Sequence, residues 1–321
     1  MRILSGIQPS GLLHIGNYFG MMRPAIALQQ EGETFYFIAD FHALTTLRDP
    51  AALRANSRRV AVDFLACGFD PKKGALFRQS DVAEVAELAW ILSTVTPLSR
   101  LELAHSYKDK VARGMAANAG LFTYPVLMAA DILIYDSDLV PVGKDQKQHI
   151  EITRDLAARF NETFKAETFR LPEPRIQPAT ETVPGIDGQK MSKSYGNTID
   201  LFGDEKETRK RVMSIVTDSA PVEAPKDAAN STIFQLYSLV ADSAGSSEMR
   251  AAFERGGVGY GDFKKELFAK LWAYFAPMRA RRAEIMAQPN YVDDVLAEGA
   301  KRAREIAKRV MERVRHAVGL F

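Results

Sequence analysis

The stretch that decides the fold class is the amino-terminal segment Ile3-Leu4-Ser5-Gly6-Ile7-Gln8-Pro9-Ser10-Gly11. Its first five residues are typical of a buried strand, and Pro9 and Gly11 predict that this strand ends in a turn. A helical pattern follows over about residues 14–30, and a second buried strand is expected over residues 34–39. The chain therefore begins as strand, turn, helix and strand.

The same alternation continues through the first half of the chain. Helices are expected at about residues 51–66, 124–135 and 146–160, and strands around residues 75–77 and 138–142. Strands that alternate with helices predict a parallel sheet covered by helices on both faces. The sequence thus predicts an α/β fold with a doubly wound, Rossmann-like parallel sheet.

The second half of the chain differs in pattern. Residues 171–197 are rich in proline and glycine and are interpreted as one long functional loop. Beyond them the pattern is helical, with the last two helices expected at residues 262–287 and 291–318. Together with the length of 321 residues, this predicts two domains, an α/β domain over residues 1–198 and an all-helical domain over residues 199–321.

The composition excludes several classes of protein. A net charge of +2 does not indicate a nucleic-acid binder, so any RNA surface must come from local clustering, and DNA is not an expected partner. Cys67 is the only cysteine, which excludes a disulfide framework and fits a buried thiol, and no Cys/His cluster suggests a metal site. Without a signal peptide or a run of roughly 20 apolar residues, the expected location is the cytoplasm, with no membrane contact.

The turn after the first strand carries the first candidate motif, His14-Ile15-Gly16-Asn17. The carboxyl end of a parallel strand is where α/β proteins bind nucleotides, and a helix N-terminus offers backbone N–H groups to phosphates. Gly16 would let an adenine ring lie against the backbone, while His14 and Asn17 can donate to a transferring phosphoryl group. The alternative is an ordinary strand-to-helix turn with a polar capping residue.

The second candidate motif is Lys190-Met191-Ser192-Lys193-Ser194, flanked by Gly188 and Gly196. Two lysines three residues apart on a glycine-flanked loop can bring two positive charges onto a leaving pyrophosphate. A given five-residue string arises by chance in a chain of this size about once in ten thousand cases, so this motif is fairly specific. The alternative is a solvated basic turn.

These two motifs, 176 residues apart, resemble the signature pair of class I aminoacyl-tRNA synthetases. Over nearly its whole length the chain resembles the bacterial tryptophanyl-tRNA synthetases. The resemblance is carried by the stretch from Ser5 to Tyr18 and by two further strings, Thr123-Tyr-Pro-Val-Leu-Met-Ala-Ala-Asp-Ile-Leu133 and Val140-Pro-Val-Gly-Lys-Asp-Gln-Lys-Gln-His-Ile-Glu151. It implies that the helical domain binds the tRNA anticodon and that the protein is a homodimer.

The resemblance implies an amino-acid pocket around Asp131, whose carboxylate would accept the indole N–H of tryptophan. A carboxylate on an apolar helix needs a donor, and the indole ring offers one donor and no acceptor. A charge paired inside the protein is the alternative. The other positions that match pocket residues, each of which could instead be an ordinary core residue, are His42, Tyr124, Met128, Val140, Val142 and Gln146.

The resemblance also implies the residues that bind ATP. The matching positions are Gln8, Pro9, Ser10, Gly16, Asn17, Gly143, Lys144, Asp145, Val183, Lys190, Met191, Ser192, Lys193 and Ser194. Lys110 matches a lysine that reaches the phosphates, although it could be a surface lysine. His14, Asn17, Lys110, Lys190 and Lys193 are the expected catalytic residues. Two departures from the family are Lys144, where many members are acidic, and the short approach to the lysine motif, which weakens the match at Val183.

The implied reaction joins tryptophan to ATP as tryptophanyl-adenylate, releases pyrophosphate, and then transfers tryptophan to the terminal adenosine of its tRNA. Mg²⁺ would be carried with ATP, because no carboxylate cluster in the sequence is dedicated to it. Residues 301–316 hold seven Lys or Arg against two Glu and repeat apolar residues at helical spacing. Their arginines, expected to point away from the apolar stripe, either contact tRNA or belong to a solvated helix.

Three other functions remain open from the sequence. A tyrosyl-tRNA synthetase shares the motifs but would need groups for a phenol and often carries an extra RNA-binding module. A small ligase or nucleotidyltransferase of the same superfamily would lack the long helical second half. A non-catalytic paralogue that binds RNA or senses tryptophan would be expected to have lost part of one motif, and both are complete.

Overall fold

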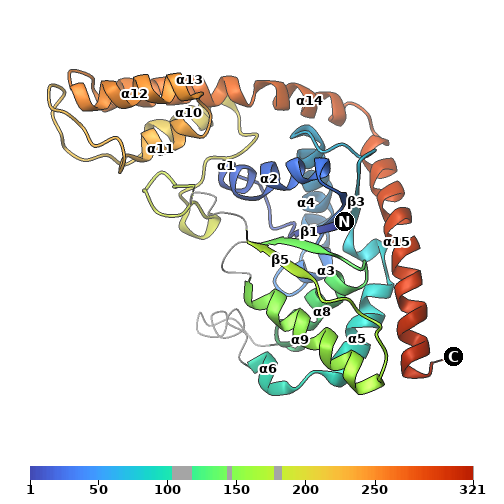
Figure 1. The fold of residues 1–321 in the computed structure, drawn as a ribbon. Helices are drawn as coiled ribbons and strands as arrows, with labels where there is room; N and C mark the ends of the chain where they lie inside the picture. The colour runs from blue at the N-terminus through green and yellow to red at the C-terminus, as the bar shows by residue number, and fades with distance from the viewer. Residues whose placement is uncertain (103–117, 143–146, 177–182, 321) are drawn as a thin grey trace.

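The computed structural model describes residues 1–102, 118–142, 147–176 and 183–320 (Figure 1). Its centre is a five-stranded parallel sheet with the strand order β3-β2-β1-β4-β5. The strands are β1 (Arg2–Ile7), β2 (Glu33–Ile38), β3 (Gly74–Arg78), β4 (Leu139–Val142) and β5 (Glu173–Ile176). The order runs outward from β1 in both directions, which confirms the doubly wound α/β fold.

Strand β5 lies inside the stretch that the sequence predicted to be a loop, so that prediction is wrong for residues 173–176. The strand contains Pro174, which lacks a backbone N–H. A proline is tolerated at the edge of a sheet, and among the described strands β5 lies at the edge, where it pairs with β4.

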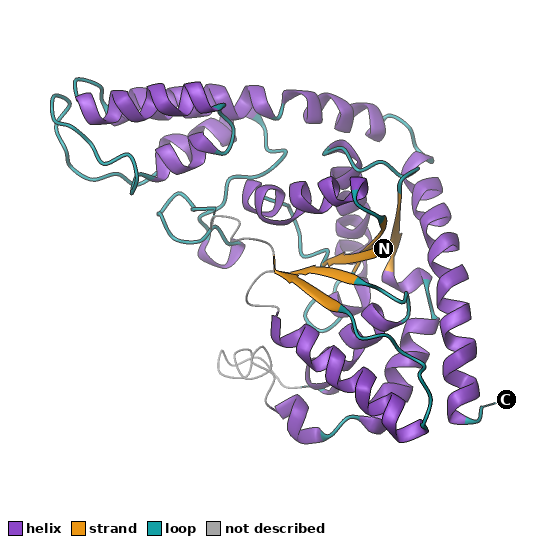
Figure 2. Ribbon diagram, in the orientation of Figure 1, coloured by secondary structure: helices purple, strands orange, loops and turns teal. Residues whose placement is uncertain are grey.

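The helices cover both faces of the sheet, as Figure 2 shows. Tyr36 and Ile38 of β2 belong to one core cluster, whereas Phe35 and Phe37 belong to the other, because successive side chains of a strand point to opposite faces. The helices and helical turns of this part are α1 (Ile15–Asn17), η1 (Tyr18–Met22), α2 (Arg23–Ala27), η2 (Leu28–Gln30), α3 (Asp40–Ala43), α4 (Pro50–Ala66), η3 (Gln79–Asp81), α5 (Glu84–Val95), α6 (Leu98–Glu102), α8 (Ala119–Leu133), α9 (Lys147–Phe164) and η5 (Lys193–Tyr195).

Beyond the sheet, a group of helices that we call the helical lobe spans residues 205–286 and extends away from the sheet (Figure 1). It consists of α10 (Glu205–Met213), α11 (Thr232–Ser238), α12 (Ser243–Arg255), α13 (Tyr260–Tyr274) and α14 (Ala276–Met286). The sequence predicted one helix over residues 262–287, but the structure breaks it at Phe275. Pro277 explains the break, because its ring has no N–H and clashes with the carbonyl four residues earlier.

The last helix, α15 (Tyr291–Val318), turns back and packs along β3 and α5. Its apolar stripe, which includes Ala303, Val310 and Val314, is buried against the sheet domain, as its periodicity predicted. The predicted division of the chain into two domains at residue 198 stays a prediction. Within the predicted second domain, the last helix, α15, packs against the sheet domain.

The arginines of α15 were expected to point away from that stripe, and three of them bind residues of the sheet domain at its sides. Arg302 donates to the carbonyls of Pro71 and Gly74, and Arg313 forms an ion pair with Asp136. Arg315 forms a bidentate ion pair with Glu87. Arg309 is exposed and donates to a carbonyl of its own helix. Arg302, Arg313 and Arg315 therefore link this helix to the sheet domain.

At Gly299 the backbone of α15 comes close to that of strand β3. A Cβ added at Gly299 would lie 2.1 Å from the carbonyl oxygen of Leu76 in β3, so Gly299→Ala should destabilise the fold by about 3 kcal/mol. In α13 a Cβ at Gly261 would meet nothing within 4 Å, and Gly261→Ala should be neutral or stabilise by up to about 1 kcal/mol. Thermal unfolding of both variants checks this, and a Gly299→Ala protein as stable as wild type would contradict the packing.

Among the described residues, no helix is both long and apolar enough to span a lipid bilayer.

Candidate active site

The first motif, residues 14–17, lies directly after the central strand. β1 ends at Ile7, and His14 forms the N-cap of α1, where its backbone N–H donates to Oδ1 of Asn17 over 3.0 Å. Because the strand order runs outward from β1, this turn lies at the point where α/β proteins open a ligand crevice. Of the matched positions in the turn, Gln8 and Ser10 are exposed and Pro9 is buried.

The lysine loop, residues 190–194, meets the first motif although the two are far apart in the chain. Backbone bonds join Ile15 to Ile199 and Leu201 to Leu13, so the segment after the loop pairs with the segment that contains His14. Nζ of Lys193 donates to the carbonyl oxygen of Ser10 over 3.1 Å. A Cβ at Gly16 would lie 2.9 Å from Nδ1 of His14 and 3.3 Å from Cβ of Met191, so a larger residue there would crowd the His14 ring first and the loop second.

Asn197 holds the lysine loop in shape. Its side-chain amide donates to Asp187 and to the carbonyl of Lys190, and its oxygen accepts the N–H of Ser192 over 2.8 Å. The hydrogen bond from Asn197 also lowers the pKa of the Asp187 carboxyl.

The two ends of the lysine loop are fixed by backbone bonds. The N–H of Met191 donates to the carbonyl of Val183, which ties the start of the loop to the beginning of the segment that leads into it. Gly196 ends the short helical turn η5 with a φ of 63°, a conformation that favours glycine. Lys190 and Ser194 are exposed. Hydrogen bonds therefore hold the backbone of the loop in place, while the side chains of Lys190 and Lys193 extend from its surface.

His14 is held in its neutral form. Burial, with a smaller contribution from the charge of Lys193, lowers its pKa from 6.5 to about 4. The buried Nδ1 of its ring has no hydrogen-bond partner among the residues that the structure describes. A neutral imidazole with a free nitrogen can bind a ligand group without carrying a charge of its own.

The low pKa of His14 predicts how stability depends on pH. Between pH 6.5 and about 4 the unfolded chain binds a proton at this residue and the folded chain does not, so stability falls as the pH drops through that window and is unaffected above it. In His14→Gln this contribution is absent, so acidification from pH 7 to pH 4.5 should lower the Tm of wild type by about 2–4 °C more than that of the variant.

The control for this measurement is His316→Gln, the same change at an exposed histidine of α15. It should follow the wild-type curve closely. Parallel curves for wild type and His14→Gln would show that His14 does not resist protonation in the folded protein.

A second cluster of polar residues surrounds Asp131, which lies on α8. The side chain of Asp131 is 1% exposed. Nε2 of Gln79 donates to both carboxylate oxygens, over 2.8 and 2.9 Å, and Nε2 of His42 lies 2.9 Å from Oδ2. Burial raises the pKa of Asp131, and the bonds from His42 and Gln79 oppose that rise. The carboxylate is thus held by two neighbours that both follow strands at the carboxyl edge of the sheet.

Gln79 and Asp40 belong to this cluster and were not predicted from the sequence. The side-chain oxygen of Gln79 accepts the backbone N–H of Phe41 over 3.1 Å, and Asp40 accepts the N–H of Ser80 over 2.9 Å. Asp40 directly follows the strand predicted at residues 34–39, and Gln79 lies just after the strand predicted at residues 75–77. Their position at the carboxyl edge of a parallel sheet was the one signal that could have singled them out.

Aromatic and apolar residues complete the surroundings of Asp131. The hydroxyl of Tyr124, whose pKa burial raises to about 12, lies 3.2 Å from Nε2 of His149, and the Tyr124 ring meets that of His42 edge-on. Met128 is half-buried on the same helix, and Val140 of β4 is buried. Val142 ends β4. Lys110, Gly143, Lys144, Asp145 and Gln146 lie outside the described residues, so their predicted roles stay predictions.

Within the described ranges, no three His, Cys, Asp or Glu side chains are grouped so that they could hold a metal ion.

Comparison with known proteins identifies the family. Residues 1–276 match the model of class I tRNA synthetases for tryptophan and tyrosine (W and Y). The chain is 56% identical over 320 residues to the tryptophan–tRNA ligase of Rhodopirellula baltica, with all of both chains covered. It is 52% identical to that of Fusobacterium nucleatum, covering 99% of this chain and 98% of the relative.

A solved structure agrees with these matches. The tryptophanyl-tRNA synthetase of Campylobacter jejuni, in complex with ADP and tryptophan, superimposes with a TM-score of 0.94 and 49% identity, covering 99% of this chain and 100% of that one. The chain belongs to the class I tRNA synthetases for tryptophan and tyrosine. Within that family, the relatives matched over their full length are tryptophan–tRNA ligases.

Proposed function

We propose that this protein is a tryptophan–tRNA ligase that activates tryptophan with ATP and transfers it to tRNA. The observation that carries the proposal is the buried carboxylate of Asp131, which lies at the same edge of the sheet as the first motif and the lysine loop. The names of the full-length relatives, and the ADP and tryptophan bound to the Campylobacter jejuni protein, support both substrates.

The hydrogen bonds of Asp131 suit an indole. An ionised carboxylate offers about four acceptor positions, and Gln79 and His42 occupy three of them. The remaining position can accept the one N–H of tryptophan. Phenylalanine would leave it unpaired at a cost of about 1–3 kcal/mol. The rest of the pocket is assigned to His42, Tyr124, Met128, Val140, Val142 and Gln146.

In the first step, a carboxylate oxygen of tryptophan forms a bond to the α-phosphorus of ATP, and the bond from that phosphorus to the bridging oxygen breaks. Lys190, Lys193 and Lys110 would attract the departing pyrophosphate, while His14 and Asn17 would bind the phosphoryl group. Mg²⁺, carried in with ATP, would neutralise phosphate charge. Catalysis would come from positioning and charge stabilisation, with no covalent nucleophile on the protein.

The other nucleotide contacts are assigned by position. Gln8, Pro9, Ser10 and Gly16 lie on the turn after β1, and Val183 precedes the lysine loop. Gly143, Lys144 and Asp145 would approach the ribose and phosphates from the end of β4.

In the second step, a hydroxyl of the terminal tRNA adenosine attacks the carbonyl of the adenylate, and AMP leaves. We assign tRNA recognition to the helical half of the chain, which as a proposal includes anticodon binding within residues 199–321. A homodimer in the cytoplasm completes the proposal.

Tryptophan-dependent exchange of labelled pyrophosphate into ATP, with Mg²⁺ and without tRNA, tests the proposed function. We expect tryptophan to support exchange and tyrosine and phenylalanine not to. Better exchange with tyrosine would identify a tyrosyl-tRNA synthetase, and no exchange with any amino acid would indicate a non-catalytic paralogue.

A further inference from the structure

A π-helical turn follows the first motif without a break. Residues Tyr18–Met22 form η1, immediately after Asn17. Turns of this kind are rare in proteins, and those that occur often lie at functional sites. The backbone N–H groups of Asn17 and Tyr18 both donate to the carbonyl of His14. The position of Tyr18 is therefore coupled directly to the backbone of the first motif.

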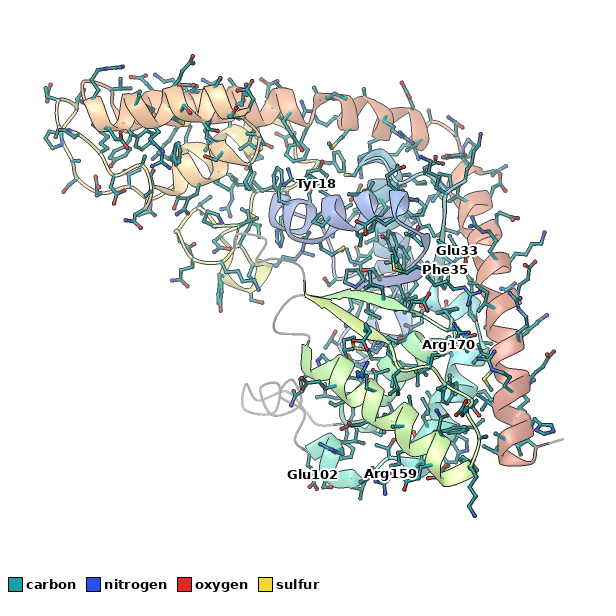
Figure 3. All side chains as sticks on the ribbon, viewed as in Figure 1. Tyr18, Glu33, Phe35, Glu102, Arg159 and Arg170 are labelled. Carbon is teal, nitrogen blue, oxygen red and sulfur yellow. The ribbon has the colours of Figure 1, made fainter. Side chains whose placement is uncertain are left out.

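The side chain of Tyr18 reaches the helical lobe. Its hydroxyl lies 3.2 Å from the hydroxyl of Tyr274, the last residue of α13, and its ring meets that of Phe275 edge-on at 5.1 Å. Figure 3 labels Tyr18 between the helices that follow β1 and the helix pair α13–α14. Phe19 extends the contact, with its ring 5.7 Å from that of Tyr274.

This contact lies at the joint of the lobe. Phe275 separates α13 from α14, and Tyr18 and Phe275 are each only 3% exposed. Tyr18 is buried and Tyr274 is half-buried, so separating the two tyrosines would leave the Tyr18 hydroxyl without its partner, which is costly. Any rotation of α13 at this joint must therefore move Tyr18 with it or break the pair.

We propose that Tyr18 and Tyr274 form a positioning pair that sets the alignment of His14 and Asn17 according to the orientation of the helical lobe. The inference rests on the proposed function, because it assigns these two residues to the adenylate-forming step. Neither residue is among those assigned above to the binding of ATP or tryptophan. The pair acts through the first motif, so its loss should misalign groups that act in the transition state and leave ground-state binding nearly unchanged.

The test compares Tyr18→Phe, Tyr274→Phe and the double variant, which delete the hydroxyls and keep the rings. The kcat of tryptophan-dependent pyrophosphate exchange should fall about five-fold in each single variant, or about 1 kcal/mol. The double variant should fall by no more than the singles, because all three lose the same bond. The KM values for ATP and tryptophan should stay within about two-fold.

Tyr237→Phe is the matched control. The Tyr237 hydroxyl donates to Glu266 over 3.0 Å, between α11 and α13 of the same lobe, so this variant loses a hydrogen bond that does not reach the first motif. It should lower the Tm by as much as Tyr274→Phe and leave kcat unchanged.

Three results would overturn the inference while the proposed function stands: an unchanged kcat in Tyr274→Phe, an equal loss of kcat in Tyr237→Phe, or a double variant whose loss is the product of the singles. A wild-type protein that exchanges no pyrophosphate would instead refute the proposed function, and the inference with it.

Discussion

Lys193→Ala should lower the kcat of tryptophan-dependent pyrophosphate exchange by about 100-fold or more and leave the KM for tryptophan within about two-fold. The Nζ of Lys193 lies 3.1 Å from the carbonyl oxygen of Ser10, on the turn where the phosphates of ATP are proposed to bind. Burial lowers the pKa of Lys193, and the charge of Asp200 opposes this. A partly desolvated ammonium interacts more strongly with developing charge than one in water.

Lys206→Ala is the control for this prediction, since Lys206 is an exposed lysine in the first turn of α10, outside the site. It should leave both kinetic constants unchanged. If Lys193→Ala instead kept its kcat and raised only the KM for tryptophan, Lys193 would be a binding residue for the amino acid and not a charge that stabilises the departing pyrophosphate.

Asp131→Asn should lower kcat/KM for tryptophan by about 100-fold, or about 3 kcal/mol. Asparagine replaces one acceptor oxygen with an NH₂ group, and both oxygens of Asp131 now accept bonds from Gln79 while His42 approaches one of them. In the variant the new NH₂ group would face the amide of Gln79, which is itself a donor, in a buried site. The indole N–H would also lose a charged acceptor. The KM for ATP should stay within about two-fold.

Two further variants separate recognition from stability. Gln79→Met removes the amide that holds Asp131 and should raise the KM for tryptophan about ten-fold. Asp136→Asn removes the charge that pairs with Arg313, so it should lower the Tm slightly without changing the KM for tryptophan. An Asp131→Asn enzyme that keeps its tryptophan KM would refute the role of Asp131 as the indole acceptor.

The sequence by itself determined the fold class and the residues of the two motifs. Strand and helix patterns are local, so a buried strand such as residues 34–39 and the apolar stripe of α15 could be recognised from residue spacing alone. The resemblance over nearly the whole chain added the family, which the comparisons confirm. Four of the five strands were placed within a residue or so of their bounds; β5 was missed because Pro174 looks like a loop residue when its edge position is unknown.

Only the tertiary structure decided which side chains meet. Gln79 and Asp131 are 52 residues apart, and Tyr18 and Tyr274 are 256 apart, and no local pattern marks either pair. The arginines of α15 look alike in sequence, yet Arg302, Arg313 and Arg315 bind the sheet domain while Arg309 donates to a carbonyl of its own helix. Residue spacing predicts which face of an element is apolar, but the partner of a polar side chain depends on how distant segments pack, and that is determined by the whole fold.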